Sequence, residues 1–259
     1  MKNICLEIEY DGTNYQGWQA QKIKGIEPAT IQGFIEKVLA KIFQQKIKLI
    51  GSGRTDSGVH ACGQIANFKT SSNISLQKLK TALNCLLPED IKIKELKQTS
   101  LDFNARYAAK SKIYRYTILN QLRNFVFTRN YVWHIPQPLD LKLIKSEAKE
   151  LVGEHNFKAF QAADKILKPA VRFLQRIEIS AQDNFLFIDF EANGFLYHMV
   201  RNIVGTLVEV GRGKLAKGSL KTILQSLDRT KAGPTAPAKG LCLLKVKYDW
   251  GAGLDLTTR

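Results

Sequence analysis

Hydrophobic and polar residues alternate along residues 3–10, and this period of two predicts a half-buried β-strand. From Thr30 the apolar residues recur with the period of an amphipathic helix, and Thr30 is suited to be its N-cap. The same reasoning predicts three more strands and a second helix: strands over 46–50, 64–69 and 91–97, and a helix from about Ser75. The resulting order, β-α-β-β-α-β, is that of the ferredoxin-like fold, which many RNA-binding modules use.

The second half of the chain predicts another mixture of strands and helices. An alternating stretch over 111–118 predicts a strand that carries Tyr114 and Tyr116 on one face. Residues 171–180 and 185–192 predict a hairpin that turns at Asp183 and Asn184. The remaining elements are predicted as strands over 130–135 and 241–248, and as helices over 140–152 and 219–227.

A helix that begins near Gly194 is apolar around most of its surface, which predicts that it is buried. Arg201 lies inside this helix. A buried arginine needs an acidic partner, because an unpaired buried charge is costly. We therefore expect a carboxylate to lie against Arg201.

The charge balance of the chain indicates that its partner is a polyanion. Lys and Arg number 39 against 23 Asp and Glu, which gives a net charge of +16. Such an excess predicts a nucleic acid as partner ahead of an anionic membrane. No run of 18 apolar residues occurs, and the N-terminus has the pattern of a strand instead of a signal peptide, so we expect no membrane association.

The cysteines and histidines predict neither a disulfide framework nor a metal site. The chain has four of each, without C-x-x-C or H-E-x-x-H spacing. The cysteines are predicted to be buried thiols of a protein in the reducing cytoplasm: Cys5, Cys62, Cys85 and Cys242.

The candidate chemistry lies in a loop over residues 51–61. Three glycines in its first eight residues predict positive φ angles or a close approach of the backbone to another group. The loop presents Asp56 beside Arg54, and it has neither a Walker ending nor a dinucleotide fingerprint. Two interpretations remain from the residues alone. Either Asp56 makes an Asx-turn in a plain hairpin connection while Arg54 is solvated, or a rigid scaffold presents the two side chains for chemistry.

Motifs along almost the whole chain resemble those of the TruA family of tRNA pseudouridine synthases. They follow one another in the family's order: YDGTNYQGWQAQ (10–21), GRTDSGVHA (53–61), KIYRY (112–116), GEHNFKAF (153–160), FLYHMVRNIVG (195–205) and AGPTAPAKGL (232–241). Asn156 stands in the fourth motif where the family more often has Asp. The resemblance implies conversion of uridine to pseudouridine at positions 38, 39 and 40 in the anticodon arm of tRNA. It also implies a homodimer. Because this isomerisation neither gains nor loses atoms, no cofactor or metal is expected.

The resemblance also implies roles for four residues. Asp56 corresponds to the family's indispensable aspartate, and Arg201 to the arginine that meets it. Tyr114 corresponds to the tyrosine that contacts the target base, whereas Tyr116 is expected to pack in the core. Arg54 can stack on bases and bind phosphate. Asp56 either attacks C1′ or removes the 2′ proton, and Tyr114 either stacks on the uracil or handles its C5 proton.

Pattern and resemblance together predict an α+β protein with two ferredoxin-like halves, residues 1–105 and 106–259. Their antiparallel sheets are expected side by side, with a central positively charged cleft between them. Three alternatives remain. The chain is an RNA-binding module without catalysis, a metabolic enzyme that uses 51–58 as an anion nest, or a synthase for another uridine or RNA. Asp56 argues against the first two, since a carboxylate serves no pure RNA binder and repels phosphate.

Overall fold

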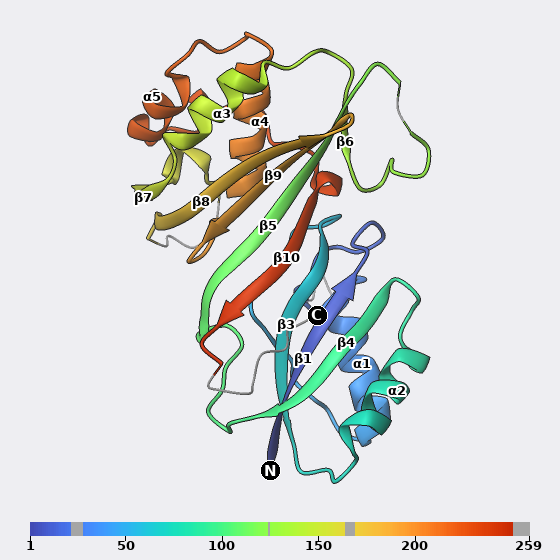
Figure 1. Cartoon of the computed structure of the whole chain (residues 1–259). Helices are drawn as coiled ribbons and strands as arrows, with labels where there is room; N and C mark the ends of the chain where they lie inside the picture. The colour runs from blue at the N-terminus through green and yellow to red at the C-terminus, as the bar shows by residue number, and fades with distance from the viewer. Residues whose placement is uncertain (22–27, 124, 164–168, 251–259) are drawn as a thin grey trace. The chain divides into compact units, whose positions relative to one another are not determined.

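The computed structural model describes residues 1–21, 28–123, 125–163 and 169–250 (Figure 1). The chain divides into two compact units. Unit 1 comprises Met1–Lys110 together with the chain from Leu243 onward, and unit 2 comprises Ser111–Cys242. The domain boundary expected near residue 105 stays a prediction.

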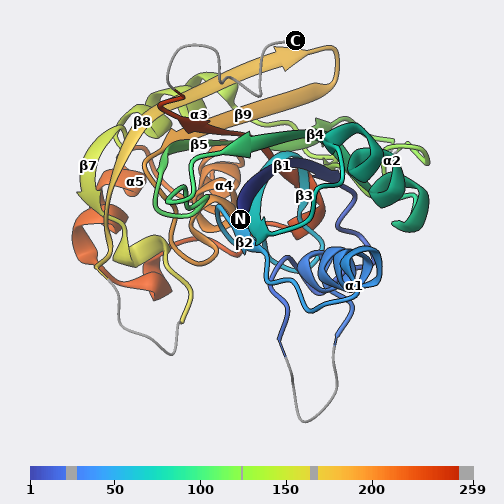
Figure 2. The ribbon, with the colours of Figure 1, turned by 90° about the horizontal axis from the view of Figure 1, so that it is seen from below.

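Unit 1 has the strand and helix order that the sequence predicts. Its elements are β1 (Lys2–Tyr10), α1 (Ile31–Phe43), β2 (Ile50–Gly51), β3 (His60–Thr70), α2 (Leu76–Leu86), β4 (Ile91–Thr99) and most of β10 (Leu241–Tyr248). Strand β1 lies between β4 and β3 and is antiparallel to both, while β2 and β10 pair with β3. Helices α1 and α2 lie on one side of β1, β3 and β4 (Figure 2). The predicted ferredoxin-like order of the first half is confirmed.

Both helices of unit 1 begin where the sequence predicts, and the predicted N-cap at Thr30 is confirmed. The hydroxyl of Thr30 accepts a hydrogen bond from the Gly33 N–H at 3.3 Å, and that of Ser75 accepts one from the Lys78 N–H at 3.4 Å. Such a cap satisfies an N–H group that has no partner inside the helix. The apolar faces of both helices are buried: Ile31, Ile35 and Leu39 in α1, and Leu79 and Leu83 in α2.

The strand predicted over 46–50 is wrong except at its end, because only Ile50–Gly51 pairs with β3. The backbone groups of Leu49 form hydrogen bonds with side chains of α1 instead of with a neighbouring strand. Its N–H donates to Glu36 at 2.9 Å, and its carbonyl accepts from the Gln32 amide at 3.0 Å. An alternating stretch thus packs its apolar residues without joining the sheet.

Unit 2 holds a set of mostly antiparallel strands and three α-helices. Its elements are β5 (Ala109–Asn120, entering the unit at Ser111), β6 (Trp133–Ile135), α3 (Leu141–Lys149), β7 (Gly153–Asn156), β8 (Val171–Gln182), β9 (Phe185–Ala192), α4 (Met199–Gly211) and α5 (Ser219–Ser226). The strand order within this unit is β5-β9-β8-β7, with β6 parallel to β5. The hairpin of β8 and β9 turns at Asp183, whose φ of 53° is in the left-handed region. The predicted α+β class is confirmed.

Helix α4 is buried along nearly its whole length, as its apolar sequence predicts. It begins at Met199 instead of near Gly194, because His198 has a left-handed φ of 59° that interrupts helical geometry. Gly205 in the middle of α4 lies against another backbone segment. A Cβ atom there would be 1.7 Å from the carbonyl oxygen of Pro234. The helix therefore packs directly on the loop that follows α5.

The prediction of four buried thiols is wrong for Cys62 and Cys85, which are exposed, and Cys242 is half-buried. Cys62 occupies an outward-facing position of β3, and Cys85 lies away from the Leu79 and Leu83 face of α2. Cys5 is fully buried, and burial raises the pKa of its thiol to about 12. In the described part of the chain, no helix is long and apolar enough to cross a bilayer.

Candidate active site

The loop that carries Asp56 lies between β2 and β3 of unit 1, and its first half is bound to β3. The N–H of Ser52 donates to the Ile65 carbonyl at 2.7 Å. The Ser52 hydroxyl donates to the Gln64 side-chain oxygen at 2.6 Å, and the Gln64 amide donates to the Gly53 carbonyl at 3.1 Å. Gln64 is fully buried, so the entry to the loop has a fixed path.

A second loop, residues 11–21, holds the backbone on both sides of Asp56. The Trp18 N–H donates to the Thr55 carbonyl at 3.1 Å, and the Gly58 N–H donates to the Tyr15 carbonyl at 3.3 Å. The carbonyl of Asp56 itself accepts from the Val59 N–H at 3.2 Å, and the side chain of Asp56 is half-buried. The structure thus presents this carboxylate from a loop whose backbone is fixed by its neighbours.

Two glycines of the second loop permit this close contact. A Cβ atom at Gly12 would lie 2.0 Å from the Val59 carbonyl oxygen. Gly17 has a φ of +84°, and a Cβ atom there would lie 2.6 Å from the Thr55 carbonyl oxygen. No side chain fits at such distances, so the motif over 10–21 is the backbone support of the Asp56 loop.

Arg54 is exposed, and glutamines orient it. Its Nε donates to the Gln19 side-chain oxygen at 2.9 Å. The Gln19 amide donates in turn to the Gln32 oxygen at 2.7 Å, and Gln32 is bound to the Leu49 carbonyl. Gln32 is a further residue of the site that the sequence motifs did not indicate. It could have been recognised as a polar residue beside the apolar stripe of α1. Its relative exposure is only 6 %, and a buried polar side chain needs hydrogen-bond partners.

Tyr114 and Tyr116 share the buried face of β5 in unit 2. Tyr114 has a relative exposure of 7 %, and its ring meets Phe195 edge-to-face with the centroids 5.2 Å apart. The Tyr116 hydroxyl donates to the Pro237 carbonyl at 2.7 Å, and burial raises the pKa of this phenol while the charge of Arg201 opposes the shift. Tyr116 therefore packs in the core as predicted, and the contact of Tyr114 with a base stays a prediction.

Arg201 lies in the first turn of α4 and is half-buried. Its Nε donates to the Ala236 carbonyl at 2.8 Å, and its own carbonyl accepts from the Ala236 N–H at 3.1 Å. The two residues are thus bound to each other reciprocally. The structure places Asp56 and Arg54 together on one loop of unit 1, and Tyr114 and Arg201 in unit 2. The pairing of Asp56 with Arg201 stays a prediction.

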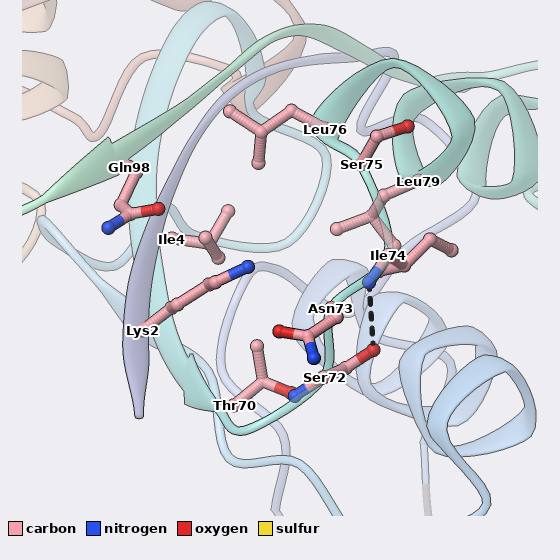
Figure 3. Close-up of a pocket in the computed structure, with 10 residues that line it drawn as sticks. All are labelled: Lys2, Ile4, Thr70, Ser72, Asn73, Ile74, Ser75, Leu76, Leu79 and Gln98. Carbon is pink, nitrogen blue, oxygen red and sulfur yellow. Dashed lines mark hydrogen bonds between the residues drawn. The ribbon is translucent and has the colours of Figure 1, made fainter.

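Unit 1 has a pocket lined by residues of β1, β3, β4 and α2 and of the segment between β3 and α2 (Figure 3). Its lining includes Lys2 and Ile4 from the start of β1, and the Ser72 hydroxyl beside it accepts a hydrogen bond from the Ile74 N–H. The far end of β1 carries Tyr10, whose hydroxyl is hydrogen-bonded to that of Thr55. The length of a nine-residue strand therefore separates this pocket from Asp56.

Among the described residues, no three His, Cys, Asp or Glu side chains gather in a way that could hold a metal ion. The residues that the sequence predicts for the site carry a carboxylate, a phenol and guanidinium groups. The expected independence from cofactors stays a prediction.

Comparison with known proteins places the chain in a family. The model of the tRNA pseudouridine synthase family matches residues 7–108 and 148–249. The chain belongs to this family. A protein of Thermoanaerobacter sp. (strain X514) named tRNA pseudouridine synthase A is 46 % identical over 248 residues, which cover 96 % of this chain and all of the relative. One of Clostridium perfringens (strain 13 / Type A), named tRNA pseudouridine synthase A 2, is 47 % identical over the same length.

As a member of the tRNA pseudouridine synthase family, the protein is an isomerase that acts on tRNA. The first matched segment includes Arg54 and Asp56, and the second includes Arg201. Tyr114 lies between the two segments. Its proposed contact with the target base therefore depends on the KIYRY motif alone.

A Gly17→Ala substitution tests the backbone support of the Asp56 loop. We expect it to lower kcat by about tenfold or more, because the methyl group would push against Thr55 and displace the neighbouring Asp56. Gly213→Ala is the matched control. Gly213 has a similar φ of +73°, but a Cβ atom there meets nothing within 4 Å. Both variants carry a backbone strain of about 1–2 kcal/mol, so equal losses of kcat in the two would contradict the assigned role of Gly17.

Proposed function

We propose that this isomerase converts uridine to pseudouridine at positions 38, 39 and 40 in the anticodon arm of tRNA, with Asp56 as the catalytic carboxylate. The observation that carries the proposal is the Asp56 loop, in which backbone hydrogen bonds on both sides present a half-buried carboxylate. Family membership supplies the reaction, and the motif GRTDSGVHA supplies the choice of Asp56.

The reaction needs one ionised carboxylate and no external reagent. Asp56 attacks C1′ as a nucleophile or removes the 2′ proton as a base, and the uracil leaves as an anion when the C1′–N1 bond breaks. The uracil then turns and C5 bonds to C1′. In the first route the Asp56–C1′ ester bond breaks at this step, and in the second route C2′ regains its proton from Asp56. Finally the C5 proton is lost and N1 gains a proton. The numbers of atoms and electrons are the same before and after, so the reaction itself requires no oxidant or reductant.

The other three residues serve the substrate in this proposal. A base inside a stacked arm must leave the stack before C1′ can be reached, and a group must fill its place. Arg54, oriented by Gln19, can stack on bases and bind phosphate. Tyr114 contacts the extruded uracil. Arg201 pairs with Asp56 and offsets the charge of its carboxylate.

We also propose a homodimer that works in the cytoplasm and holds tRNA on a positively charged cleft. The net charge of +16 and the TruA resemblance support these assignments. The alternative target is another uridine or another RNA. It is tested with tRNA transcripts in which only one of positions 38, 39 and 40 is a uridine, while the uridines elsewhere in the tRNA are kept. The proposal expects pseudouridine in each of these transcripts. Pseudouridine that formed only at other positions would contradict the assigned target.

Affinity for tRNA is expected to fall steeply with salt. Lys and Arg that neutralise phosphates release bound counterions, so six or more contacts would weaken binding by about 10³-fold between 50 and 200 mM salt. Filter binding or fluorescence titration of Asp56→Asn protein over this range measures the change without turnover. A change below about twofold would contradict binding through the phosphate backbone.

A further inference from the structure

A buried asparagine next to Arg201 connects three separate segments of unit 2. Asn202 has no exposed surface, and its amide donates to the Phe160 carbonyl at 2.8 Å. Its side-chain oxygen accepts from the Thr235 hydroxyl at 2.6 Å and from Arg229 at 3.0 Å. The residue after Arg201 is therefore fixed in position by the segment before β8 and by the loop after α5.

Arg229 uses a charged group to fix this loop. One guanidinium nitrogen donates to the carbonyls of Ala232 and Gly233, at 3.3 and 3.0 Å. The other donates to Asn202 and to the Thr235 hydroxyl, the latter at 3.2 Å. These four bonds go to uncharged oxygen atoms, and burial lowers the pKa of Arg229. Arginine provides several donors in one rigid plane, which suits it to hold several backbone groups at once.

The loop that Arg229 fixes ends at the partner of Arg201. Gly233 donates to the Thr206 hydroxyl on α4 at 2.9 Å, and Thr235 directly precedes Ala236. The Ala236 carbonyl is the acceptor for Arg201 Nε. Arg229 thus holds the neighbour of each member of this pair, Asn202 beside Arg201 and Thr235 beside Ala236.

We propose that Arg229 and Thr235 are positioning residues of the isomerase, which set the orientation of the Arg201 guanidinium through Asn202 and the Ala236 carbonyl. This inference rests on the proposed role of Arg201 at the reacting carboxylate. Neither residue touches substrate in this assignment. Their loss lowers the rate of the chemical step and leaves affinity for tRNA unchanged.

Substitution of Thr235 separates positioning from packing. Thr235→Val keeps the shape and removes the hydroxyl that donates to Asn202, whereas Thr235→Ser keeps the hydroxyl. We expect Thr235→Val to lower kcat by about tenfold to a hundredfold, with a Kd for tRNA within twofold of the wild type. Thr235→Ser is expected to keep most of the wild-type kcat. Thr222→Val is the control, because the exposed Thr222 hydroxyl donates to the carbonyl of Gly218, the residue that precedes α5. If Thr235→Val had wild-type kcat, the inference would be overturned whatever its melting temperature.

A double-mutant cycle tests whether Thr235 acts through Arg201. Single-turnover rates are measured for Thr235→Val, for Arg201→Lys and for the double variant. We expect the loss from Thr235→Val to shrink to less than half when Lys already replaces Arg201, since coupled residues are not additive. Full additivity would overturn the inference. Wild-type turnover and inactive Asp56→Asn, measured beside the cycle, show separately whether the proposed function holds.

Arg229→Met provides the second perturbation, with Lys231→Met as control on the same short segment. We expect kcat to fall at least as far as in Thr235→Val, with tRNA Kd again within twofold, and the control to keep wild-type kcat. An Arg229→Met protein that folds and keeps wild-type kcat would overturn the role of Arg229.

Discussion

Asp56→Asn is expected to abolish pseudouridine formation while affinity for tRNA stays close to that of the wild type. Asparagine has the size of aspartate, but its amide is neither a nucleophile nor a base at C1′ or the 2′ proton. The loss of an essential catalytic group of this kind typically costs about 10⁴-fold in kcat or more. The loop keeps its path, because the bonds that hold it join the backbone of Thr55 and Gly58 to residues 15 and 18.

Release of tritium from tRNA labelled at C5 of uridine measures the rate, and a binding titration measures the affinity. Asp183→Asn is the matched control, because the residue lies in the turn of β8 and β9 at a φ of 53°, which asparagine adopts readily. We expect this control to have full activity. An Asp56→Asn protein as active as the control would refute the assignment of the catalytic carboxylate.

Arg201→Ala is expected to lower kcat by about 10²- to 10³-fold, the size of effect seen when a group that stabilises charge in an active site is removed. The substitution also removes the hydrogen bond to the Ala236 carbonyl. A hydrogen bond from a charged donor typically contributes about 1.5–3 kcal/mol, so the melting temperature should fall as well. Activity and stability are therefore both affected, in contrast to Asp56→Asn.

The same tritium-release assay and a thermal melt measure the two effects of Arg201→Ala. Arg212→Ala, at the other end of α4, is the control for loss of a guanidinium that bonds to neighbouring side chains. We expect it to lower stability without a comparable loss of kcat. An undiminished rate in Arg201→Ala would show that Arg201 is not the partner of Asp56.

The order of elements in unit 1 could be predicted because local signals agree there. Thr30 and Ser75 cap the helices that their sequences predict, and the apolar stripes of both helices are buried. The structure of segment 46–50 could not be predicted. The backbone groups of Leu49 form hydrogen bonds with side chains of α1, and these contacts between separate segments are not visible in the local pattern. The start of α4 was missed for a different reason. The single left-handed residue His198 delays a helix whose apolar pattern begins earlier.

The candidate site was visible in the sequence only at the residues that carry its chemistry. The glycines of residues 51–58 and the acid between them mark the Asp56 loop, and Gly58 has the positive φ that the pattern predicts. The residues that hold the site in position could not be recognised in the sequence. Gly17 matters because it meets Thr55, and Asn202 because it meets Arg229, and neither contact follows from the period or composition of either segment. Contacts between distant segments need the folded chain.

The most direct test of the central claim maps pseudouridine in bulk tRNA of cells that lack the gene, after complementation with the wild-type or the Asp56→Asn gene. The account predicts that pseudouridine at positions 38, 39 and 40 is absent without the gene, returns with the wild type and does not return with Asp56→Asn. Restoration of pseudouridine at these positions by the Asp56→Asn gene, or no loss of it when the gene is removed, would contradict the account.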